Sequence, residues 1–176
     1  MPTGSGNQPP APSGARPALD EETFVARYGG VFERSPWIAR AVWPRAPFAT
    51  VEALHEAMVA VVRAAPRDDQ LALIRAHPEL AGREALAGEL TDASTREQAS
   101  AGLDRLTASE LERWRSLNRE YRDRFGFPLV VCVREHTKDS ILAWAHERLG
   151  NDVDAEVEFA LEEIAKIARL RLEDAL

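Results

Sequence analysis

Leu129-Val130-Val131-Cys132-Val133 decides the fold class, because it is the only run in the chain with the apolar, β-branched character of a buried strand. A strand needs a neighbour for its backbone hydrogen bonds, and the sequence offers no second run of this kind. We therefore interpret residues 129–133 as a buried extended connector or as the start of a helix. The rest of the chain shows residues that are typical of helix starts and helix ends, so the sequence predicts an all-α fold.

Capping residues indicate where the helices begin, since Ser, Thr, Asp and Asn are favoured directly before a helix. Ser94 with Glu97, and Thr107 with Glu110, also have the spacing of a capping box. Between His77 and Ser94, residues 79–93 show no such pattern and are expected to be irregular. The expected helix starts lie at Asp20, Ser35-Pro36, Thr50, Asp68-Asp69, Ser94, Thr107, Thr137 and Asp152. They predict a single compact bundle of about eight to nine helices.

Length and composition indicate one globular domain, with 176 residues of which 45% are hydrophobic. Residues 1–18 are rich in Pro and Gly and lack apolar periodicity. We interpret them as a disordered tail, which leaves residues 19–176 as the all-α domain.

The net charge of −7 disfavours nucleic acid and anionic membranes as partners. A small anionic substrate stays possible, because a few arginines can form a local positive pocket. No apolar run approaches the roughly 20 residues that span a bilayer, and no secretory signal is recognisable. Cys132 is the only cysteine, so no internal disulfide can form and a reducing compartment, the cytoplasm, is expected.

His77 stands out among the four histidines because Pro78 follows it. Proline disfavours helical geometry in the residue before it, so a helix is expected to end at His77. A histidine there can simply bond the last carbonyls of the helix. Alternatively, the loop can direct the ring into a cleft, where an imidazole with a pKa of about 6.5 handles protons. The local pattern leaves both interpretations open.

Glu97 has two interpretations as well. It can cap the helix that starts at Ser94, or it can meet a substrate at a helix N-terminus, where backbone N–H groups gather. The chain has no Gly-rich phosphate loop, no His-Glu-x-x-His motif and no cysteine pair.

Several separated motifs resemble those of the family of 2-oxo-4-hydroxy-4-carboxy-5-ureidoimidazoline (OHCU) decarboxylases, which act at the last step from urate to (S)-allantoin. The resemblance runs from about Phe24 to Leu172. The motifs that carry it are His77-Pro78-Glu79-Leu80-Ala81-Gly82, Ser94-Thr95-Arg96-Glu97-Gln98, Phe125-Gly126-Phe127-Pro128 and Glu163-Ile164-Ala165-Lys166-Ile167-Ala168-Arg169-Leu170-Arg171-Leu172. Their order along the chain is more specific than any one of them.

This resemblance implies an all-α carboxy-lyase without metal or cofactor, commonly a homodimer, that acts on a small molecule, OHCU. It implies that His77 and Glu97 are catalytic. It also implies that Arg171 binds substrate, while Arg169 faces elsewhere on the helix. The substrate-binding set is Pro78, Ser94, Thr95, Arg96, Glu97, Gln98, Leu129, Val130, Val131, Cys132, Val133 and Arg171.

The chain departs from the family pattern near the end of the pocket segment. Leu129 stands where many relatives have another aromatic residue, and Arg134-Glu135-His136 replaces a commoner Arg-Gly pair. Two alternatives therefore accompany the main hypothesis. One is an all-α binding module that has lost activity, and the other is a lyase for a related ureido or imidazoline compound.

Overall fold

Nine α-helices, two short 3-10 helices and no β-strand form residues 19–175, the part of the chain that this computed structural model describes. This confirms the predicted all-α class. The predicted tail, residues 1–18, lies outside the described residues. The helices are α1 Glu21–Tyr28, α2 Trp37–Val42, η1 Trp43–Arg45, α3 Val51–Ala64, α4 Arg67–Ala76, α5 Arg83–Ala87, α6 Asp92–Ser100, α7 Ala108–Phe125, η2 Val133–Glu135, α8 Lys138–Arg148 and α9 Val153–Asp174.

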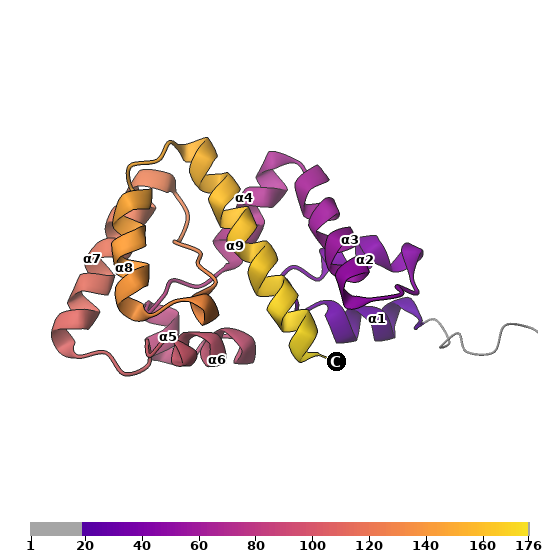
Figure 1. The fold of residues 1–176 in the computed structure, drawn as a ribbon, viewed down its shortest axis with the longest axis horizontal. Coiled ribbons are helices and arrows are strands. Elements are labelled where there is room, and N and C mark those ends of the chain that lie inside the picture. Colours follow the sequence, from indigo (N-terminus) through magenta and orange to yellow (C-terminus); the bar gives the residue numbers. More distant parts are fainter. Residues whose placement is uncertain (1–18, 176) are drawn as a thin grey trace, which may run out of the picture.

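Helix α9 is the longest and runs through the middle of the molecule (Figure 1). Helices α1, α2 and α3 lie to one side of it, and α5 to α8 lie to the other. Helices α3 and α4 pack directly against α9. Its buried apolar residues recur every three or four positions, at Val157, Ala160, Leu161, Ile164, Ile167, Ala168 and Leu172. Fully burying a large aliphatic side chain stabilises a fold by roughly 1.5–3 kcal/mol, so this stripe anchors the core.

Caps at five helix starts agree with the sequence. In each case the side chain accepts a hydrogen bond from the backbone N–H three residues later, at Asp20, Thr50, Thr107, Thr137 and Asp152. Thr107 and Glu110 form the predicted capping box. Helix α7 ends at Gly126, whose φ of 76° lies in the left-handed region that favours glycine. Local chemistry therefore determines these boundaries.

Three local predictions are wrong. Ser35 does not cap α2, since Pro36 is the N-cap and no side chain accepts a cap hydrogen bond; the Ser35 hydroxyl donates to the carbonyl of Glu33 at 2.9 Å. Helix α6 starts three residues earlier than predicted, and Thr91 is its N-cap, accepting from the backbone N–H of Ser94 at 3.3 Å. Residues 79–93 are consequently not irregular throughout, since they include α5 and the start of α6.

The buried segment 129–132 has no strand partner and leads into η2, as the sequence indicates. Side chains from two helices bind its backbone instead. Arg148 Nη1 of α8 donates to the carbonyl of Val130 at 3.0 Å. The backbone N–H of Cys132 donates to Glu163 Oε2 of α9 at 2.8 Å. The segment is thereby held between α8 and α9. No helix among residues 19–175 is long and apolar enough to cross a membrane.

Candidate active site

His77 follows the last turn of α4, is buried and lines a small inner pocket. Its backbone is extended, with φ −73° and ψ 137°, as the following Pro78 requires. Its Nδ1 lies 3.0 Å from the carbonyl oxygen of Leu73. Because a carbonyl oxygen only accepts, Nδ1 carries the proton and Nε2 of the neutral ring keeps a lone pair. The neutral ring thus offers a proton acceptor at Nε2.

Burial lowers the pKa of His77 from 6.5 to about 4. The Leu73 carbonyl and the charge of Glu33 favour the protonated ring, whereas the charge of Arg171 disfavours it. His77 is therefore neutral near pH 7. A neutral imidazole with a free lone pair can act as a general base.

Two buried amides hold the loop after α4. Gln98 Oε1 accepts from the backbone N–H of Ala81 at 2.9 Å, and Gln98 Nε2 donates to the carbonyl of Glu79 at 3.3 Å. From α7, Asn118 Nδ2 donates to the carbonyl of Leu80 at 2.9 Å. These bonds secure a strained turn, because Ala81 has a φ of 51°, which residues other than glycine adopt rarely. Gln98 thus supports the loop that presents the histidine.

Arg171 of α9 contacts two carboxylates. Its Nε and Nη2 donate to the two oxygens of Glu97, each at 2.7 Å. Its Nη1 donates to Glu33 Oε2 at 2.9 Å, and Nη2 also donates to Ser94 Oγ at 3.3 Å. Burial lowers the pKa of Arg171, but the two carboxylates outweigh burial and raise it above its ordinary value. The guanidinium therefore stays charged.

Glu33, in the loop between α1 and α2, is a site residue that the sequence analysis missed. Its side chain is 1% exposed, and its Oε2 also accepts from Ser94 Oγ at 3.0 Å. Burial raises the pKa of this carboxyl, but Arg171 and Ser94 lower it below its usual value. Its partners lie 61 and 138 residues away, so no local spacing marks it. The only signal is a charge directly after the apolar pair Val31-Phe32.

Most of the predicted site residues line one inner pocket. Its free volume is about 30 Å³, far below the roughly 300–1,000 Å³ of typical small-molecule sites, so a ring substrate requires side chains to move. The lining residues are His77, Pro78, Leu80, Ser94, Glu97, Gln98, Leu129, Val130, Val131, Val133, Ile167 and Arg171.

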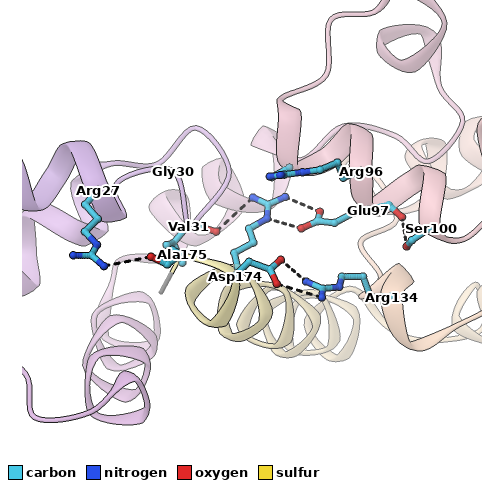
Figure 2. A pocket seen from close by; sticks show the side chains of 11 residues that line it. Arg27, Gly30, Val31, Arg96, Glu97, Ser100, Arg134, Asp174 and Ala175 are labelled. Carbon is cyan, nitrogen blue, oxygen red and sulfur yellow. Dashed lines mark hydrogen bonds and ion pairs between the residues drawn. The ribbon is translucent and has the colours of Figure 1, made fainter.

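A wider outer cavity of about 470 Å³ adjoins this pocket. Glu97 and Arg171 line both spaces, so their ion pair lies at the boundary. Figure 2 shows Arg27, Arg96 and Arg134 around the outer cavity. Arg134 pairs with Asp174, which also lines the cavity, at 2.7 Å, so Arg27 and Arg96 are the cations that can attract an anion there.

Three predicted site residues do not line the inner pocket. The hydroxyl of Thr95 donates to the carbonyl of Thr91 at 3.0 Å within α6, and Arg96 faces the outer cavity. Cys132 is buried, and burial raises the pKa of its thiol to about 12, which keeps it protonated. No three His, Cys, Asp or Glu side chains between residues 19 and 175 form a group that could hold a metal ion.

A family model described as OHCU decarboxylase matches residues 17–173. The chain belongs to the OHCU decarboxylase family. A Halalkalicoccus jeotgali protein named as this decarboxylase is 42% identical over 88% of this chain and 86% of its own length. The Mus musculus protein of the same name is 40% identical over 90% of this chain and 89% of its own length. A Bacillus subtilis protein named as a bifunctional uric acid degradation protein is 39% identical over 90% of this chain and 31% of itself.

Solved structures agree with this membership in the OHCU decarboxylase family. The crystal structure of an (S)-allantoin synthase superposes with a TM-score of 0.71 at 32% identity and covers 90% of this chain and 51% of the other. An OHCU decarboxylase crystallised in the presence of (S)-allantoin gives a TM-score of 0.67 at 22% identity, over 89% of this chain and 97% of the other. The second likeness concerns the fold alone.

Proposed function

We propose that this chain decarboxylates OHCU to (S)-allantoin at the end of urate breakdown. The observation that carries the proposal is the neutral His77, with a free Nε2, in the same inner pocket as the Arg171–Glu97 pair. Membership in the OHCU decarboxylase family supports the substrate.

The substrate itself accepts the electron pair that decarboxylation releases. OHCU carries a hydroxyl and a carboxylate on one ring carbon, next to a C=N bond. When the bond to the carboxylate breaks, CO₂ leaves and the electron pair forms a C=C bond to the neighbouring ring carbon. The C=N electron pair moves to nitrogen, which takes up a proton. The enol then loses its hydroxyl proton and gains one on the neighbouring carbon, so no external electron sink is needed.

Three side chains divide the work in this proposal. His77 Nε2 accepts the hydroxyl proton and supplies a proton to one face of the enol, which sets the product's handedness. Arg171 offers a fork of donors to the carboxylate. Glu97 binds a ring or ureido N–H once it leaves Arg171. Leu129 and Val131 form apolar walls that limit water.

A coupled assay tests the proposal. Urate oxidase and hydroxyisourate hydrolase generate OHCU in the cuvette, and circular dichroism follows the allantoin that forms. Added protein should accelerate the formation of one enantiomer. Racemic allantoin at the uncatalysed rate would contradict the proposal, and would favour a binding module or a lyase for a related compound.

Homodimerisation and a cytoplasmic location remain further predictions, supported by the family resemblance and by the single cysteine. Light scattering during gel filtration measures the mass of the particle in solution. A mass of about one chain at micromolar concentration would contradict the dimer.

A further inference from the structure

We propose that Glu33 is a positioning residue of this site. It holds Arg171 so that one edge of the guanidinium stays directed at a substrate carboxylate. The inference rests on the proposed function, because it assigns the place that the carboxylate of OHCU takes.

The two sides of the guanidinium have different partners. Nη1 donates to Glu33 Oε2 at 2.9 Å and to the carbonyl of Val31 at 3.4 Å. The opposite edge, formed by Nε and Nη2, meets both oxygens of Glu97. If Glu97 moves away, the loop at residues 31–33 still holds Nη1. The free edge then presents two parallel N–H donors, the arrangement that binds a carboxylate best.

The carboxylates of Glu33 and Glu97 differ in how easily they can move away from Arg171. The side chain of Glu33 is 1% exposed and that of Glu97 is 14% exposed. Glu97 lines both the inner pocket and the outer cavity, whereas Glu33 lines neither. An incoming substrate therefore meets Glu97 first. The carboxylate of the substrate has the charge and shape of the Glu97 carboxylate and can replace it on the same edge of Arg171.

Ser94 joins the three groups. Its hydroxyl donates to Glu33 Oε2 at 3.0 Å and accepts from Arg171 Nη2 at 3.3 Å. The hydroxyl can donate only one hydrogen bond, and Glu33 is the acceptor of that bond. Removing the charge of Glu33 therefore loosens both the hydroxyl and the guanidinium.

Kinetics of Glu33→Gln test the assignment, because this change removes the charge with little change in shape. We expect KM for OHCU to rise about tenfold or more, which corresponds to about 1.4 kcal/mol of binding. Allantoin lacks the carboxylate, so its inhibition constant should stay within about twofold of wild type. A wild-type KM would overturn the inference. Equal weakening of OHCU and allantoin would overturn it as well, because that pattern indicates general damage to the pocket.

Three further variants complete the test. Glu33→Asp keeps the charge and should restore KM at least in part. Glu156→Gln changes another buried carboxyl group, which bonds Arg148 outside the pocket, and should leave KM within about twofold of wild type. If Glu33→Gln does not fold, Ser94→Ala must raise KM in the same direction by a smaller factor, and an unchanged KM overturns the inference. Wild-type protein that fails to convert OHCU overturns the proposed function instead.

Discussion

His77 and Arg171 are both buried, yet their neighbours give them opposite charge states. His77 bonds only a backbone carbonyl, so burial dominates and the ring is neutral. Arg171 bonds two carboxylates, which preserve its charge. The pocket thus places a neutral base near a fixed cation. That combination suits removal of a hydroxyl proton from an anionic substrate.

The low pKa of His77 has a consequence for stability. The ring has a pKa of 6.5 in the unfolded chain and of about 4 in the folded one. Between these values the unfolded chain binds a proton that the folded chain does not, so stability is fully present above pH 6.5 and falls as the pH drops toward 4. The shift corresponds to roughly 3 kcal/mol. Urea unfolding at about pH 7.5 and about pH 5 should show a larger loss for wild type than for His77→Asn. Equal losses would contradict the shift.

Sequence reasoning found part of this residue pattern. The Pro78 rule located the end of α4, and the family motifs located His77, Glu97 and Arg171. Glu33 was not predicted as a site residue, because its partners lie on α6 and α9, far along the chain. Long-range pairing of this kind leaves no periodic trace in the sequence.

At the level of the helix, local caps predict boundaries well until two candidates compete. Thr91 and Ser94 lie three residues apart, and both can start α6. The structure selects Thr91 because Ser94 is buried and bonds Glu33 and Arg171. The apolar run at 129–133 shows a similar limit. Its lack of a strand partner was predictable, but its anchoring by α8 and α9 side chains was not.

Loss of the α6 cap should destabilise the protein. Thr91→Ala removes the side-chain acceptor for the backbone N–H of Ser94 and should cost about 1 kcal/mol. Thr95→Ala, one turn later and exposed, serves as the control and should cost less. Urea unfolding midpoints measure both. An unchanged midpoint for Thr91→Ala would show that this cap contributes nothing.

Over the whole molecule, α9 joins the two sides of the fold. Besides its apolar stripe it carries three buried ionisable residues, Glu156, Glu163 and Arg171. Each finds a partner outside the helix, on α8, in the segment 129–132, and on α6 with the α1–α2 loop. The sequence predicted a helix that starts at Asp152, but not its central place in the fold. The partners of its charges depend on tertiary structure and were not predictable from the helix alone.

The buried pair between Arg148 and Glu156 is the strongest test of this joining role. Arg148 Nε donates to Glu156 Oε1 at 2.7 Å, and the hydroxyl of Tyr121 also donates to Glu156. Burial raises the pKa of Glu156 to about 8. Arg148→Met removes the cationic partner of this carboxyl, which can then take up a proton, so the loss should be about 1–3 kcal/mol in the free energy of unfolding. Denaturant unfolding measures the loss. A loss below about 1 kcal/mol would indicate that the pair does not hold α8 to α9.

The most direct test of the account compares (S)-allantoin formation by wild-type protein and by His77→Asn in the coupled assay. An asparagine amide can replace Nδ1–H as donor to the Leu73 carbonyl but lacks the Nε2 acceptor. We expect turnover to fall on the order of 10² or more, with an unchanged far-ultraviolet circular dichroism spectrum. Conversion by His77→Asn at the wild-type rate would contradict the assignment of His77 as the base.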